Sequence, residues 1–172
     1  KRIAYTPDYN GALLCDRETR AICEKAVRKF EELGCVVEEY APDLGRLQDA
    51  FMILRAQHFV VDRELQLRDH RAALKADIIW NTEQGLKQTP SDLAWAERER
   101  AAFYRRMVEL FDRYDVFITP SAGTPAFDVN RTHPSSIDGV KLTNYMGGSM
   151  QNAAMTLCSA AAVAVPAGFD QY

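Results

Sequence analysis

The sequence lacks most of the features that mark specialised classes of protein. Its 172 residues include only four cysteines, at positions 15, 23, 35 and 158, with no C-x-x-C pair and no spacing typical of a metal site. Scattered free thiols are typical of a reducing compartment. We therefore expect a cytoplasmic protein.

Long apolar runs and blocks of like charge are also missing. No run approaches the roughly 20 apolar residues that span a bilayer, and the first residues contain no continuous apolar segment of a secretory signal. The 21 basic and 24 acidic residues leave a formal charge of -3 that no segment concentrates. This balance argues against a general phosphate-binding surface. We predict neither a membrane nor a nucleic-acid partner.

What is present is the composition of an ordinary globular domain, with 47% hydrophobic and 26% charged residues. Arg2 to Thr6 and Cys35 to Glu39 are predicted strands. The segment between them predicts a helix that Asp16 caps and Gly34 ends. A strand, a helix and a second strand in this order form a βαβ unit, whose two strands normally lie parallel. The opening therefore predicts an α/β fold.

Helices are expected through the middle of the chain. Leu44 to about Arg71 predicts a long helix, with a shorter one around Ile78 to Gly85. Thr89, followed by Pro90 and Asp92, is the start signal of another long helix. The apolar faces expected on the two long helices are Phe51, Leu54, His58, Val61 and Leu65 on the first, and Ala96, Phe103, Met107, Leu110 and Tyr114 on the second.

The last third of the chain alternates short apolar segments with loops. Asp115 to Thr119 predicts a buried strand that Pro120 stops, and a loop with a turn at Asp138-Gly139 follows up to Asn144. Ser149 to Leu157 predicts a helix, and Ala162 to Val165 a last buried strand.

The chain offers no convincing nucleophile or metal site. Gly147-Gly148-Ser149 looks like a nucleophile loop, but no strand precedes it, and we interpret Ser149 as the cap of the following helix. His58, His70 and His133 show no metal-ligand spacing. We expect no catalytic residue and no metal within these residues.

Three polar side chains flank the end of the predicted strand Asp115 to Thr119. They are Thr119, Ser121 and Thr124, and α/β folds place ligand crevices at the carboxyl ends of their strands. They are candidates for lining a substrate pocket. The alternative is that they are ordinary turn residues.

Three blocks of the sequence resemble the amidase signature family. They are the opening segment through EELGCVVEEY, the segment YDVFITPSAGTPAF, and the stretch from Tyr145 to Phe169, in which Thr156 and VPAGF match the family's T-x-x-x-x-P-A-x-x-V-P-x-G-F pattern. The match departs from the family at Ser159 to Ala161, where Gly-x-Pro is usual. The resemblance adds Thr156 to the expected pocket lining.

The resemblance implies a mixed sheet with parallel βαβ units flanked by several helices, as an incomplete piece of the amidase-signature α/β/α sandwich. It also implies hydrolysis of linear carboxamides by a Ser nucleophile with a second Ser and a Lys, without a cofactor. The loop and the Lys that carry this chemistry are not matched in residues 1–172. We therefore expect one partial domain over 1–172 that is inactive by itself.

One further expectation follows, and two alternatives stay open. An incomplete sheet has unpaired edges and exposed apolar surface, so we expect self-association. The parent enzyme is either a stand-alone amidase or the subunit that releases ammonia for tRNA-dependent amidation. A non-enzymatic α/β module that binds a ligand or regulates a partner is the rival interpretation, because no nucleophile is apparent.

Overall fold

The computed structural model describes residues 1–142 and 144–170, in two compact units. The first unit comprises residues 1–44 and 104–172, and the second comprises residues 45–103. The single partial domain over residues 1–172 stays a prediction. Among the described residues, no helix is long and apolar enough to cross a membrane.

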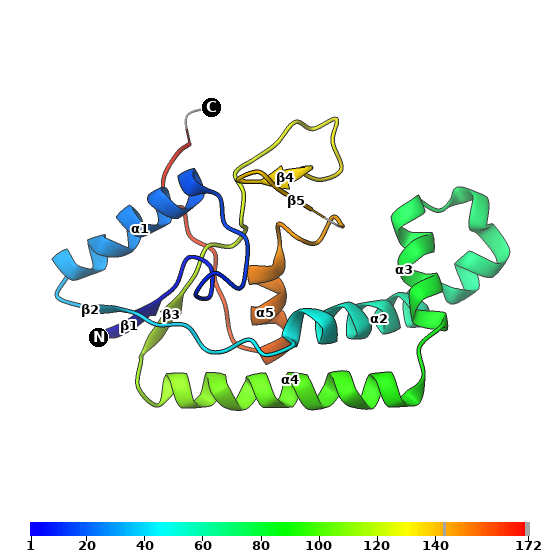
Figure 1. Cartoon of the computed structure of the whole chain (residues 1–172), viewed down its shortest axis with the longest axis horizontal. Coiled ribbons are helices and arrows are strands. Elements are labelled where there is room, and N and C mark those ends of the chain that lie inside the picture. The colour runs from blue at the N-terminus through cyan, green and yellow to red at the C-terminus, as the bar shows by residue number, and fades with distance from the viewer. Residues whose placement is uncertain (143, 171–172) are drawn as a thin grey trace. The chain divides into compact units, whose positions relative to one another are not determined.

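A parallel three-stranded sheet organises the first unit (Figure 1). Its strands are β1 (Arg2–Tyr5), β2 (Val36–Glu39) and β3 (Val116–Ile118), in the order β2-β1-β3. Arg2 pairs with Val36 on one side of β1, and Ile3 pairs with Val116 on the other. The predicted α/β class and the opening βαβ unit are confirmed.

Helix α1 (Arg17–Glu32) begins and ends as the sequence predicts. The Asp16 carboxylate accepts a hydrogen bond from the Thr19 backbone N–H, and Gly34 follows the last turn at a φ of +81°. Val27 is the buried residue of α1, and it packs in one cluster with Ile3 and Tyr5. This apolar cluster holds α1 against one face of the sheet.

The second unit is helical and contains α2 (Leu47–His70), the short 3₁₀ helix η1 (Arg71–Ala73), α3 (Ala76–Leu86) and the first part of α4 (Pro90–Phe111). The predicted start of α4 is correct, because the Thr89 backbone N–H donates to the Asp92 carboxylate and the Asp92 N–H donates to the Thr89 hydroxyl. The apolar set predicted for α4 is buried throughout.

The apolar face predicted for α2 is wrong. Val61 and Leu65 are 73% and 64% exposed, and His58 is exposed as well. The buried residues of α2 are instead Leu47, Ala50, Ala56 and Leu67. Helix α3 approaches so closely that a Cβ on Gly85 would lie 2.4 Å from the Ala56 carbonyl oxygen, so Gly85 packs directly against the backbone of α2.

The loop after β3 contains an antiparallel hairpin that the sequence showed only as a turn. Strands β4 (Ser136–Ile137) and β5 (Val140–Lys141) flank Asp138 and Gly139, which have φ values of 46° and 79°. Two positive φ values in the central positions are typical of the tight turns that match hairpin twist. Ile137 is buried and anchors the hairpin to the first unit.

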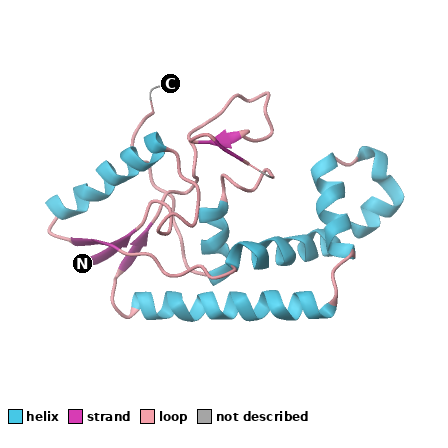
Figure 2. Cartoon of the chain, in the orientation of Figure 1, coloured by secondary structure: helices cyan, strands magenta, loops and turns pink. Residues whose placement is uncertain are grey.

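Helix α5 (Met150–Cys158) confirms the predicted last helix, but the strand predicted after it is not formed. Residues 159–170 are drawn as loop in Figure 2. Val163, Val165 and Phe169 are 86%, 69% and 98% exposed. A strand needs a partner for its backbone hydrogen bonds, and within the described residues this segment has none.

Candidate functional site at the carboxyl ends of the strands

The chain leaves the sheet at neighbouring points after β1 and β3. The backbone N–H of Thr6, which follows β1, donates to the carbonyl of Ile118 at the end of β3, at 3.1 Å. From β1, the chain passes through α1 to β2 on one side, whereas β3 lies on the other side. Parallel sheets bind ligands at such a point, where the strand order reverses, just outside the carboxyl ends of the strands. The candidate site is therefore the group of loops that follows β1 and β3.

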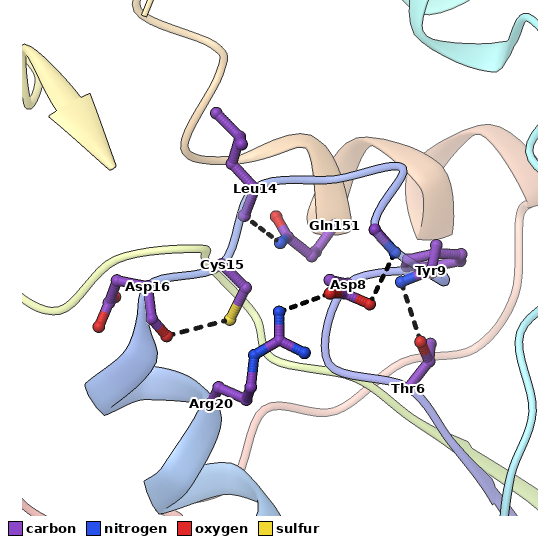
Figure 3. A network of polar contacts seen from close by, with 9 residues as sticks. Thr6, Asp8, Tyr9, Leu14, Cys15, Asp16, Arg20 and Gln151 are labelled. Carbon is purple, nitrogen blue, oxygen red and sulfur yellow. Dashed lines mark hydrogen bonds and ion pairs between the residues drawn. The ribbon is translucent and has the colours of Figure 1, made fainter. Parts of the chain in front are cut away.

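The loop after β1 is held in an unusual conformation by Asp8 (Figure 3). The Asp8 carboxylate accepts a hydrogen bond from the Gly11 N–H at 3.0 Å, and its backbone carbonyl accepts one from the Leu13 N–H at 2.9 Å. Tyr9 and Asn10 both have positive φ, at 55° and 58°. Residues other than glycine rarely adopt a positive backbone φ, and residues held there often belong to functional loops.

Arg20 of α1 completes the support of this loop. Its guanidinium forms an ion pair with the mostly buried Asp8 carboxylate, and Figure 3 shows it reaching from the first turns of α1. The hydrogen bond to Asp8 raises the pKa of Arg20 above its usual value. The Asp8 carboxylate is thus committed to the ion pair and the Gly11 amide, so its role is structural.

Tyr9 connects this loop to the β3 side of the sheet. Its ring packs edge to face on Phe117 of β3, with centroids 5.7 Å apart. Burial raises the pKa of the Tyr9 hydroxyl, so it remains protonated near neutral pH. Among the described residues this buried hydroxyl has no hydrogen-bond partner, and the same is true of Thr119 Oγ1 and Gln151 Oε1.

Gly123 is the point where three segments of the site meet. Its N–H donates to the Gly148 carbonyl at 2.9 Å, and its own carbonyl accepts from the Asp16 N–H at 2.8 Å. A Cβ at this position would lie 2.1 Å from the Leu14 carbonyl oxygen. The loop after β3, the start of α5 and the segment before α1 therefore pack backbone against backbone here.

Of the three predicted pocket residues on the loop after β3, Thr124 lies beside this junction. Thr119 is half-buried, Ser121 is exposed, and the Thr124 hydroxyl donates to the Pro125 carbonyl at 2.8 Å. The Thr124 methyl group would lie 3.4 Å from a Cβ placed on Gly148. The structure thus brings Thr124 close to the start of α5, and pocket lining by these residues stays a prediction.

Thr156 lies at a different place from the other three. It is exposed on α5, and its hydroxyl donates to the Asn152 carbonyl one turn earlier, at 2.9 Å. Its expected role in the pocket also stays a prediction. Ser149 occupies the N-cap position of α5 as expected, but its side chain makes no capping hydrogen bond.

Sequence reasoning missed Asp8, Arg20 and Gln151 as members of the site. The Asn10-Gly11 pair was a turn signal that could have drawn attention to Asp8. Gln151 had no such signal, because its amide N–H donates to the Leu14 carbonyl from 137 positions away along the chain.

The groups that could attack an amide are poorly suited to do so in these residues. All six lysines are exposed, so none lies in the buried, apolar surroundings of a lysine that acts as a general base. Burial raises the pKa of Cys15 to about 12, and it also raises the pKa values of Cys23 and Cys158. Their thiols are therefore weak nucleophiles near neutral pH. Residues 1–142 and 144–170 contain no group of three side chains suited to hold a metal ion.

Known proteins resemble the chain across nearly its whole length. A curated acylamidase from Rhodococcus erythropolis is 24% identical over 174 residues, which is 98% of this chain and 35% of the acylamidase. Among solved structures, a bacterial aryl acylamidase of the amidase signature family has a TM-score of 0.77 at 22% identity, over 91% of this chain and 35% of that one.

Two further solved structures share the fold at lower identity. An amidase has a TM-score of 0.78 at 17% identity, over 91% of this chain and 36% of that chain. The 6-aminohexanoate cyclic dimer hydrolase has a TM-score of 0.69 at 12% identity, over 92% of this chain and 36% of that chain. The chain thus spans about a third of the length of these relatives.

The fold of the chain is accordingly that of amidase-signature enzymes. The sequence profile of the Amidase family matches residues 1–172. Because this match covers every residue, the chain belongs to the amidase family.

Proposed function

We propose that the protein hydrolyses linear carboxamides, releasing a carboxylic acid and an amine or ammonia. The family match over residues 1–172 carries this proposal. The acylamidase and aryl acylamidase among the relatives support an N-acyl amide as the substrate class. The scattered free thiols support a cytoplasmic location.

The reaction follows the Ser-Lys route that the family resemblance implies. A Ser oxygen attacks the amide carbonyl and loses its proton to the neighbouring Ser and Lys. The C–N bond then breaks, and the amine leaves with that proton. Water hydrolyses the resulting ester and restores the Ser. We place the nucleophilic Ser and its Lys outside residues 1–172, and the exposure of all six lysines in this range supports that placement.

The test compares the full-length protein with residues 1–172 alone. Full-length protein should hydrolyse acyl anilides or aliphatic carboxamides, and a fluorophosphonate should label one Ser outside residues 1–172, as located by peptide mass mapping. Residues 1–172 alone should show neither turnover nor labelling. Turnover by the shorter chain would contradict the placement of the chemistry. Full-length protein that binds amides without turnover or labelling would favour a ligand-binding module.

We also propose that residues 1–172 self-associate when prepared alone. β2 and β3 are the edges of the three-stranded sheet, and Val36 and Val116 on them are 55% and 42% exposed. Exposed apolar side chains on sheet edges favour pairing with another copy. Light scattering should show an apparent mass that rises with protein concentration. A constant monomer mass up to high concentration would refute the proposal.

A further inference from the structure

Gln151 occupies a position that packing alone does not explain. It is 1% exposed, yet its side chain is polar. Its Nε2 donates to the Leu14 carbonyl at 2.9 Å, which joins α5 to the segment before α1. Figure 3 shows this hydrogen bond next to the Asp8 and Arg20 pair. The Oε1 of this buried amide has no partner among the described residues. Burying such an amide stabilises the folded protein less than burying an apolar side chain of the same size.

The Gln151 hydrogen bond lies against the Gly123 junction. A Cβ on Gly123 would be 3.3 Å from Gln151 Nε2, and 2.1 Å from the same Leu14 carbonyl oxygen that Gln151 binds. The bond therefore holds the Leu14 carbonyl directly beside the Gly123 backbone. Gly123 belongs to the loop that also carries Ser121 and Thr124.

We propose that Gln151 is a positioning residue, which fixes the loop of residues 121–124 for binding of the amide substrate. The inference rests on the proposed amidase function. When Leu14 is held in place, the Asp16 N–H can bind the Gly123 carbonyl and the Gly123 N–H can bind the Gly148 carbonyl. Without Gln151, this loop must be ordered at the moment of binding, which weakens substrate affinity.

The variant that tests this role in the full-length protein is Gln151→Met. Methionine has a similar size and a flexible apolar side chain, so it fills the buried space without the donor. With an acyl anilide as substrate, KM should rise about tenfold while kcat changes less than about threefold, because the reacting groups lie elsewhere. Asn152→Ala, at the exposed next position on α5, is the control and should leave both constants unchanged.

Hydrogen exchange provides a readout that does not depend on activity. The backbone amides of Asp16 and Gly123 should exchange at least about tenfold faster in Gln151→Met than in the wild type, and Asn152→Ala should not change them. Unchanged exchange at both amides overturns the proposal. So does an unchanged KM, or a loss of kcat at constant KM.

The two hypotheses fail in different ways. If the wild-type protein hydrolyses no amide, the proposed function is wrong and the exchange rates alone decide whether Gln151 fixes the loop. If the wild type is active but Gln151→Met binds the acyl anilide as well as the wild type does, only the positioning role is wrong.

Discussion

Replacing Gly123 with alanine should destabilise the first unit by about 3 kcal/mol or more, at the upper end of what overpacking costs. The new Cβ would lie 2.1 Å from the Leu14 carbonyl oxygen, a separation far below van der Waals contact. The neighbour is backbone, so no rotation of a side chain relieves the clash. Separating the two segments would also break the hydrogen bond between the Asp16 N–H and the Gly123 carbonyl.

Urea unfolding followed by circular dichroism measures the loss of stability in Gly123→Ala. The matched control is Gly148→Ala. Gly148 is buried in the same junction, but its Cβ would meet nothing closer than the Thr124 methyl group at 3.4 Å. We expect the midpoint for Gly148→Ala to stay near that of the wild type. Equal midpoints for the two variants would show that the loops at Gly123 can separate at little cost.

The second large effect is expected for Gly85→Ala in the second unit. In an exposed helix this change would stabilise by about 1 kcal/mol through helix propensity. Here the Cβ would lie 2.4 Å from the Ala56 carbonyl oxygen and 2.5 Å from Val60 Cγ2. We expect the clash to outweigh the gain in helix propensity, because α2 must move away from α3. The free energy of unfolding should fall by about 2 kcal/mol.

The neighbouring variant Leu86→Ala is the control for this prediction. Leu86 is 50% exposed at the end of α3, so its truncation should change the free energy of unfolding by less than about 1 kcal/mol. Urea unfolding of both variants shows whether Gly85→Ala lowers or raises the free energy of unfolding. A Gly85→Ala protein more stable than the wild type would mean that α2 and α3 separate without loss of packing.

Local signals in the sequence were reliable, and signals that depend on a distant partner were not. The start of α4 was predicted correctly because Thr89 and Asp92 satisfy each other within one turn. The face of α2 was wrong because an apolar stripe shows which residues share a side, not which side a neighbour covers. The strand predicted at Ala162 to Val165 was wrong because a strand forms only beside a partner.

The same distinction holds at the candidate site. Thr119 was placed correctly at the carboxyl end of β3, since a short apolar segment before Pro120 is a local pattern. The Gln151 bond to Leu14 joins residues that no pattern of neighbouring positions connects. Gly123 was overlooked for a related reason, because its need for a hydrogen atom instead of a side chain comes from Leu14.

The position of β1 between β2 and β3 has a consequence for the order of folding. β1 can pair early with β2, which follows after a single helix, but Ile3 must wait for Val116. All of residues 45–103 lie between these partners, and α2 and α3 can form their own contacts meanwhile. Closing so long a loop slows folding, because its entropy is lost before the contacts form. During synthesis, the β3 side of β1 therefore stays open until Val116 has been made.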